Sequence, residues 1–491
     1  MAKIFGCDTL PVALDGRALD QEMFICRKFN RVSELTNNSH NNKKRYRGIC
    51  MTVLTATAPP ELVNADHLYR RITFRLLPFL FICYVVNYID RANIGYAKLQ
   101  FTHDLGFSDA VYGLGAGLFY ISYLLFEVPS NLYLQKIGAR ATLTRIMIIW
   151  GIASGMTCLV TTPMQLYVAR FILGAAEAGF FPGVVLYLSY WFPAARRGRV
   201  SSILLMAVAT AGLLGGLVSG WIMQEADGLF GLRGWQALFI IEAIPAVLLG
   251  LSVFWVLDDS PQKAKWLSPA ERELIRQDLE NDQAAKKANG HSGLFSALRD
   301  SRVYLLALVY CAICAGSGVI SIWGPSIIQS AGVTDLKHVG LLMMLPFAMA
   351  TVVMYLVALN SDRMFERRWH VIVPSLAAAV AFFVLSLPDI GASLTVVMLC
   401  LATAGVYSAS SVFWAIPPTY LGKNTAATGI AFISSVGAGA AGFGAAALLG
   451  WIKSETGSFS VGLSSVGVLI ILGCWLLIVC MPVHLLGLKR A

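Results

Sequence analysis

The sequence predicts an all-α membrane protein whose twelve transmembrane helices form two pseudo-symmetric six-helix bundles. Composition is the first observation behind this prediction, because 57% of the 491 residues are apolar and only 13% are charged. Soluble proteins carry about 25% charged residues, which cover their surface. A helix that crosses a bilayer needs roughly 20 apolar residues, so twelve crossings take up about half of the chain. The small share of charge therefore excludes an ordinary soluble domain.

The distribution of apolar residues is the second observation. Apolar segments of spanning length lie at 73–96, 108–134, 141–161, 164–191, 199–223 and 235–257, and again at 302–329, 337–359, 370–388, 393–418, 425–451 and 461–486. We therefore expect a first bundle at 69–257, a central cytoplasmic loop at 258–300 and a second bundle at 301–488. Residues 1–68 are expected to be a largely disordered cytoplasmic segment, in which Met51 is an alternative start of the chain.

A repeated sequence pattern in the two halves is the third observation. The fourth apolar segment ends in Trp191-Phe192-Pro193. It is followed by a basic loop and then by a helix that ends in Gly220-Trp221-Ile222. The tenth segment ends in Ile416-Pro417-Pro418. It is followed by Lys423 and then by a helix that ends in Gly450-Trp451-Ile452. Repeated halves are typical of membrane carriers that expose one site alternately to the two sides.

The basic residues predict the orientation. With the N-terminus inside, the inner short loops hold ten of them: Lys136, Arg140, Arg145, Arg196, Arg197, Arg199, Arg363, Arg367, Arg368 and Lys423. The outer loops hold four: Lys98, Arg233, Lys337 and Lys453. The positive-inside rule therefore predicts that both termini are cytoplasmic. The net charge of +10 follows from this topology, and we expect no nucleic-acid partner.

The central loop contains a predicted helix. Ser268 is placed to cap its start, Pro269 fits the first turn and Glu271 the third position. The charged helix should run to about Lys287. We interpret the loop as a linker between the bundles, and a regulatory role is the alternative.

Enzymatic and metal-binding motifs are not convincing. Cys311 and Cys314 have a CxxC spacing, but no second pair or histidine follows, so we expect helix packing. Residues 437–442 match GxGxxG inside an apolar span, where small residues favour helix packing over a phosphate site. We expect no enzyme activity, no catalytic residue, no metal and no cofactor.

Ionisable residues inside a predicted span are the strongest functional signal, because a charge there costs at least about 2.5 kcal/mol. The first span contains Asn87, Asp90 and Arg91. Neighbouring helical residues differ by about 100° in direction, so Asp90 and Arg91 should face different helices. The alternative is that both lie solvated at the outer interface.

The fourth span contains Arg170 and Glu177, which share one helix face about 10 Å apart. A guanidinium grips a carboxylate through two hydrogen bonds, whereas a buried carboxylate can exchange a proton near neutral pH. We therefore predict that Arg91 and Arg170 bind an anion and that Asp90 and Glu177 carry protons. A static charge network is the alternative.

Aromatic and hydroxyl side chains complete the predicted site. Tyr120 and Tyr123 share a face of the second span with Glu127, which we interpret as a gate residue. Core packing is the alternative for both tyrosines. No acid or base stands out within the last six spans, so the second half should supply cavity wall and hydrogen bonds. Its candidates are Trp323, Ser411, Trp414 and Ser434.

Three of these segments together resemble the major facilitator superfamily, and within it the anion:cation symporter branch. They are Leu68–Arg71 leading to Asn87–Asn93, Glu127–Leu132 leading to Arg140, and Arg170–Glu177 leading to Phe181-Pro182-Gly183. The similarity spans roughly residues 65–488, and the combination is specific.

The gating loop motif of that superfamily, GxxxDRxGRR, is degraded in this sequence. The first copy has Asn131 and Gln135 in place of its Gly and Asp, and the second has Ala358 in place of the Gly. An Asp gate is therefore not expected in the first copy, and Glu127 is a partial substitute. The gating residues that remain are Lys136, Gly138, Arg140, Asp362 and Arg363.

The resemblance implies a multi-pass protein of the inner membrane that imports a small organic carboxylate with protons, as a monomer in the lipid bilayer. Substrates in that branch include tartrate, sugar acids, phthalate and hydroxyphenylacetate. Positions matching Asp90, Arg91, Tyr123, Arg170 and Glu177 line the site or carry protons there. A drug exporter of the same fold and a non-transporting receptor are the alternatives.

Overall fold

The computed structural model describes residues 64–288, 299–417, 421 and 426–480, all within one compact unit. Within these residues, twelve helices are long and apolar enough to cross a membrane, which confirms the predicted number. The predictions for residues 1–63 and for Lys423 lie outside the described residues.

The first six crossings comprise seven helices. They are α3 (Ala65–Leu105), α4 (Asp109–Ile137), α5 (Ala139–Met156), α6 (Pro163–Glu177), α7 (Phe180–Trp191), α8 (Ala194–Glu225) and α9 (Gly234–Val256), with α6 and α7 sharing the fourth crossing. The last six are α12 (Ser301–Ser330), α13 (Leu336–Met364), α14 (Arg368–Leu385), α15 (Gly391–Phe413), α17 (Ala426–Thr456) and α18 (Ser460–Cys480).

Two of these elements differ from the prediction. Helix α3 begins at Ala65, eight residues before the predicted apolar segment, because the Asn64 side chain accepts a hydrogen bond from the His67 backbone. The fourth crossing, predicted as one helix, breaks between Glu177 and Phe180. Gly179 adopts a left-handed conformation there, with φ of 88°, which glycine tolerates because it has no Cβ.

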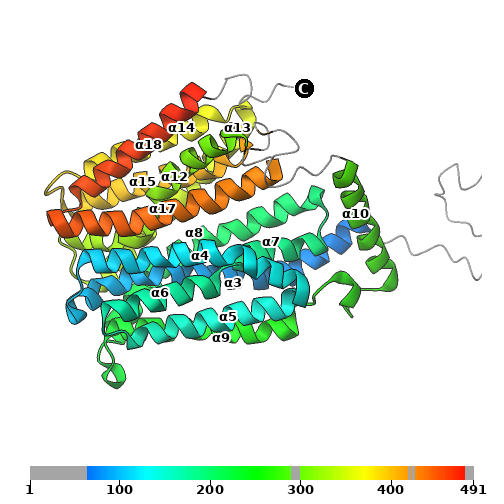
Figure 1. Ribbon diagram of the computed structural model, residues 1–491, viewed down its shortest axis with the longest axis horizontal. Coiled ribbons are helices and arrows are strands. Elements are labelled where there is room, and N and C mark those ends of the chain that lie inside the picture. The colour runs from blue at the N-terminus through cyan, green and yellow to red at the C-terminus, as the bar shows by residue number, and fades with distance from the viewer. Residues whose placement is uncertain (1–63, 289–298, 418–420, 422–425, 481–491) are drawn as a thin grey trace, which may run out of the picture. The chain divides into compact units, whose positions relative to one another are not determined.

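The two halves meet along helix pairs that cross the molecule side by side (Figure 1). Helix α4 lies along α17 and α8 along α13, with backbones in close contact. A Cβ added to Gly113 would lie 2.5 Å from the Ala446 carbonyl, and one added to Gly340 would lie 2.2 Å from the Gly216 carbonyl. Small residues thus let helices of opposite halves touch, as in other membrane helix bundles.

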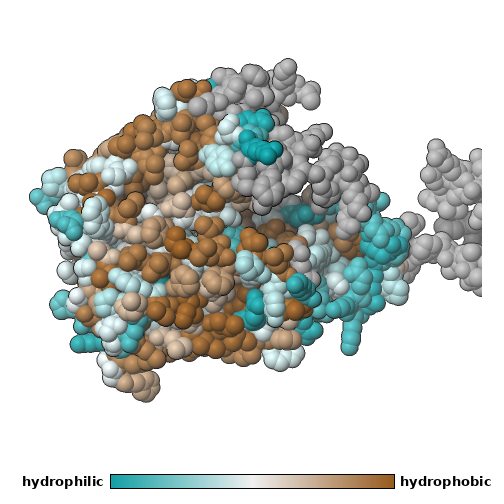
Figure 2. All heavy atoms as spheres, in the orientation of Figure 1, coloured by the Kyte–Doolittle hydropathy of each residue, from teal (hydrophilic) through white to brown (hydrophobic). Residues whose placement is uncertain are grey.

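The outer surface is the one expected for a protein in lipid. Figure 2 shows apolar residues over the middle of this face and hydrophilic residues towards its two ends. Large side chains such as Leu125, Val128 and Trp255 are more than half exposed. In water this exposure would be unfavourable, whereas acyl chains solvate such side chains.

Helix α10 (Pro269–Ala288) lies across one end of the bundle (Figure 1). The predicted cap is confirmed, since the Glu271 backbone donates to Ser268 and the Ser268 backbone donates to Glu271. Glu271 also pairs with Arg71 at 2.6 Å, and Asp278 accepts from Tyr69 at 2.8 Å. The linker helix is therefore attached to the first half. We call the opposite end, where α3, α8 and α17 end, the outer end, after the orientation that the basic loops predict.

Candidate functional site

Arg91, which is partly exposed, forms an ion pair with Glu177 between α3 and α6. The Glu177 side chain is fully buried and also accepts a hydrogen bond of 2.8 Å from Asn87. Its second oxygen, Oε2, has no hydrogen-bond partner. Asn87 and Arg91 lie one turn apart on the same face of α3, which is why both reach one carboxylate.

Aromatic rings surround the Arg91 guanidinium. Its carbon Cζ lies 4.7 Å from the ring centre of Tyr123, 5.3 Å from that of Tyr88 and 5.4 Å from that of Phe119. Ring faces attract cations, and more strongly away from water. The rings therefore pack around a guanidinium whose Nε donates to Glu177.

Arg170 is fully buried, unlike Arg91, and it has no counter-ion at ion-pair distance within the part of the chain that the structure describes. The residue is 2% exposed, and its Cζ lies 5.1 Å from the ring centre of Phe119. Its Nε and Nη1 have no hydrogen-bond partner. Burying a charge without pairing it is expensive, so these donors make Arg170 a candidate for binding an anion.

Asp90 faces away from Arg91, as its position in the helix predicts. Its Oδ1 accepts hydrogen bonds of 2.5 Å from Ser154 on α5 and 3.0 Å from Asn93, and Oδ2 has no partner. The residue is 1% exposed. The alternative of a solvated Asp90 at the outer interface is therefore wrong.

The structure brings several predicted tyrosines near the two arginines. Tyr120 interacts electrostatically with Arg91 and Arg170 and lies flat against Gly442 of α17, whose added Cβ would lie 2.3 Å from the ring. The glycines of the GxGxxG match thus serve helix packing, as predicted. Tyr310 and Tyr407, which the sequence did not single out, approach Tyr88 from the second half.

The four predicted residues of the second half occupy different environments. Trp414 packs on Tyr310, with ring centres 4.8 Å apart, and so lies beside the tyrosines. Ser411 is exposed and bonded to the Ser408 carbonyl at 2.8 Å, and Ser434 is half-buried on α17. Trp323 is fully buried, and its indole N–H donates to the Ala445 carbonyl at 3.0 Å.

Trp323 belongs to a cluster that closes the outer end, the outer cluster, which the sequence did not predict. Asp109 at the start of α4 pairs with Lys98 at 2.7 Å and with Lys453 of α17 at 3.3 Å. The ring centre of Trp323 lies 5.2 Å from the Lys98 Nζ and 4.8 Å from the Tyr112 ring. These five residues come from both halves, so the outer cluster links the halves at this end.

The predicted gating residues lie nearer the α10 end. Glu127 accepts a hydrogen bond of 3.2 Å from Ser435 of α17, which joins the two halves. Asp259, which follows α9, accepts from the Arg140 backbone at 3.1 Å and lies against Gly138. It thereby supplies a carboxylate beside the degraded loop motif. Asp362 pairs with Arg367 at 2.6 Å, and Lys136 and Arg363 are exposed.

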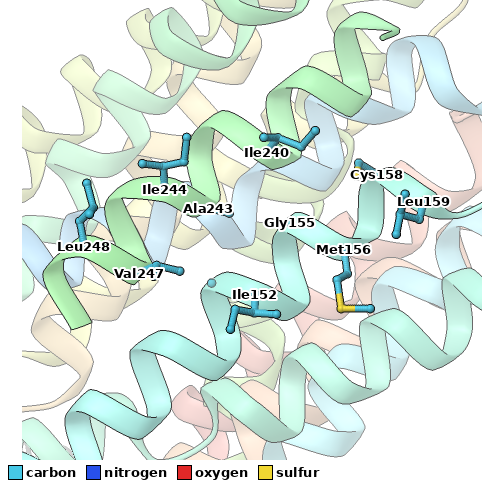
Figure 3. Close-up of a pocket in the computed structure, with 11 residues that line it drawn as sticks. Ile152, Gly155, Met156, Cys158, Leu159, Ile240, Ala243, Ile244, Val247 and Leu248 are labelled. Atoms are coloured by element: carbon cyan, nitrogen blue, oxygen red, sulfur yellow. The ribbon is translucent and has the colours of Figure 1, made fainter. Parts of the chain in front are cut away.

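A groove between α5 and α9 has a volume of about 430 Å³, but its chemistry differs from that of the arginine site (Figure 3). Its lining consists of apolar side chains and glycines, among them Ile152, Met156, Ile244 and Leu248. It offers no charged group to a carboxylate, so it is not the candidate site.

Known proteins resemble this chain over most of its length. Residues 80–446 match the family model of the Major Facilitator Superfamily. The chain is 44% identical to "Putative tartrate transporter" of Agrobacterium vitis over 83% of this chain and 94% of the relative. It is 43% identical to "Putative metabolite transport protein NicT" of Pseudomonas putida, over 84% and 95%. It is 38% identical to "Quinolone resistance transporter" of Acinetobacter baumannii, over 82% and 92%.

Solved structures share the fold. A bacterial homolog of the human lysosomal transporter Spinster superposes with a TM-score of 0.68 at 17% identity, covering 86% of this chain and 99% of the other. The xylose transporter XylE from E. coli gives 0.67 at 15% identity, over 85% and 97%. The matching family model, the similar transporters and the twelve apolar helices agree: the chain is not an enzyme and belongs to the major facilitator superfamily of membrane transporters.

Proposed function

We propose that the protein imports a small organic carboxylate together with protons by alternating access. The single observation that carries this proposal is the buried Arg170, whose Nε and Nη1 have no hydrogen-bond partner. A carboxylate is the natural occupant, because its two oxygens match the planar guanidinium fork. The name of the Agrobacterium vitis relative points to the same class of anion.

The pairing of Arg91 with Glu177 provides a route to proton coupling. A substrate carboxylate that binds Arg91 competes with Glu177 for it. Once displaced, Glu177 is a buried carboxylate without a counter-ion, and binding a proton removes that charge. Anion binding and proton binding thus favour one another, which is the requirement for symport.

Direction and energetics complete the proposal. The basic inner loops favour cytoplasmic termini and a location in the inner membrane, where the carrier works as a monomer. Each proton that enters down a potential of 100 mV supplies about 2.3 kcal/mol. One proton with a monoanion moves no net charge, so use of the membrane potential requires at least two protons per monoanion.

Export of a quinolone is a second candidate. The Acinetobacter baumannii relative favours it by name, and the tyrosines around Arg91 offer flat surfaces to a ring system. The buried Arg170 and the partly exposed Arg91 favour a small anion instead, because an exporter of apolar drugs needs a cavity with fewer charges.

Transport into liposomes separates the two candidates. The purified protein is reconstituted and an alkaline interior imposed, with tartrate, a sugar acid or an aromatic acid outside. We expect at least one carboxylate to accumulate, and its amide analogue neither to accumulate nor to compete. Failure of every carboxylate, with transport of a quinolone, would overturn the proposal in favour of export.

A further inference from the structure

Glu242 on α9 is a third buried carboxylate in the first half, and the proposed mechanism does not use it. The residue is 5% exposed. Its Oε1 accepts a hydrogen bond of 2.7 Å from Ser219 of α8, while Oε2 has no partner. An acid in an otherwise apolar span is costly and commonly functional.

Glu242 lies at the level of Asn93 on α3. The Trp235 backbone at the start of α9 donates to the Gln100 side chain at 3.0 Å, which fixes the register of the two helices. Glu242 lies seven residues, or about 10 Å, inward from Trp235, and Asn93 lies the same distance inward from Gln100. Asp90 lies one turn deeper and is bonded to Asn93. Glu242 interacts electrostatically with Asp90, and the Asn93 side chain also lies close to it.

The groups around Glu242 offer it no cation among the described residues. The titratable neighbours on α3 are Asp90 and Tyr96, and the adjoining α5 and α8 contribute the hydroxyls of Ser154 and Ser219. Arg170 interacts electrostatically with Asp90.

Three buried oxygen atoms here accept no hydrogen bond: Oδ2 of Asp90, Oδ1 of Asn93 and Oε2 of Glu242. A buried acceptor without a donor is destabilising. A proton on one carboxyl would supply the missing donor and remove one negative charge.

A charge count leads to the same conclusion. The buried carboxylates around the site are Asp90, Glu177 and Glu242, whereas its guanidinium groups are the buried Arg170 and the partly exposed Arg91. Lys98, also buried, is paired with Asp109 in the outer cluster. One negative charge is therefore left over, and a buried charge of this kind is neutralised by a proton or a bound cation.

We propose that Glu242 and Asp90 share a transported proton, in a second proton site on the side of α3 opposite Arg91. The proton bonds to a carboxyl oxygen of either residue, and Asn93 Oδ1 accepts its hydrogen bond. The inference rests on the proposed function and adds to it a proton that is bound apart from the substrate. Together with Glu177, it gives two protons per turnover.

The number of charges moved per substrate tests this inference. Wild type, Glu242→Gln and the matched control Glu280→Gln on the exposed α10 are reconstituted, and current and labelled substrate are recorded together. We expect Glu242→Gln to lower the ratio by one elementary charge and to leave substrate counterflow intact. Glu280→Gln should keep the wild-type ratio. An unchanged ratio in Glu242→Gln would overturn the inference.

Two further measurements test whether the site holds a proton. Replacing sodium by choline should not change wild-type uptake, because the site is proposed to hold a proton. If uptake depends on sodium and this dependence disappears in Glu242→Gln, the site holds a metal ion instead. In the native protein, an apolar carbodiimide should modify Glu242 at acidic but not at alkaline pH, because it reacts with protonated carboxyls. No modification at any pH would count against a protonated Glu242. If the wild-type protein transports no carboxylate at all, the proposed function is wrong, whereas an unchanged charge ratio in Glu242→Gln contradicts only the inference about Glu242.

Discussion

Glu177, the last residue of α6, forms an ion pair with Arg91 of α3 where the fourth membrane crossing breaks. The C-terminal end of a helix carries partial negative charge, which is unfavourable for a carboxylate. Arg91 compensates for this. In the mechanism that we propose, substrate binding breaks the pair and leaves Glu177 ready to take a proton.

Replacing Arg170 by lysine should weaken carboxylate binding about 10–100-fold. Lysine keeps the charge but lacks the planar fork that binds both oxygens. Arg145→Lys, at the α10 end beside Tyr133, is the matched control and should bind like wild type. Calorimetric titration with the transported carboxylate checks this. Equal affinities for the two variants would remove Arg170 from the binding site.

Gly179→Ala should destabilise the protein by about 1–2 kcal/mol or more. A left-handed φ costs an L-residue about that amount, and the added Cβ would lie 2.5 Å from the Ser130 hydroxyl. Gly198→Ala in α8 is the control, because nothing lies within 4 Å of its Cβ and alanine favours helix. Melting temperatures in detergent should fall for the first and hold or rise for the second. Equal melting would mean that the break needs no glycine.

Asp109→Asn should loosen the outer end. The substitution leaves Lys98 and Lys453 close together without their shared carboxylate, and like charges repel. Asp66→Asn at the α10 end removes an exposed carboxylate and serves as the control. Spin labels at Leu229 and Ser454, at the outer ends of different halves, report the separation. A longer distance should appear with Asp109→Asn only, and no change would show that the outer cluster does not hold the halves together.

Acid should release α10 from the first half. Hydrogen bonding from the Ser268 backbone and the Arg71 guanidinium together lower the pKa of Glu271 below its ordinary 4.5, although partial burial acts to raise it. This contribution to stability is present above pH 4.5 and is lost as the pH falls through the lowered pKa.

Glu271→Gln should imitate this release at neutral pH. A charged group at a helix start contributes about 0.3–1 kcal/mol, so amide exchange across 269–288 should become faster. Glu280→Gln, towards the other end of α10, is the control. Equal exchange in both variants and in wild type would mean that Glu271 does not hold the helix.

The sequence predicted the number of spans, the capped linker helix and the different directions of Asp90 and Arg91, because each depends on local pattern alone. Hydropathy counts the spans, and the helical repeat separates neighbouring residues. The break after Glu177 was missed, because Gly179 lies among Gly174 and Gly183 and could not be distinguished from a packing glycine.

Contacts between distant segments account for the rest. The outer cluster needs Lys98, Asp109 and Lys453 from three helices, and no local pattern connects them. Tyr310 and Tyr407 look like core aromatics in sequence. Glu242 was also missed. In this case a signal was present, because a lone acid in an apolar span is unusual and can be recognised from the sequence.

Accumulation of the carboxylate by the Glu177→Gln variant is the most direct test of proton coupling at the arginine site. Wild type and variant are reconstituted in liposomes with an alkaline interior, and both concentrative uptake and counterflow exchange are measured. We predict that the variant exchanges substrate but no longer concentrates it, because exchange needs no net proton movement. Concentration of substrate by Glu177→Gln to the wild-type level would contradict the account.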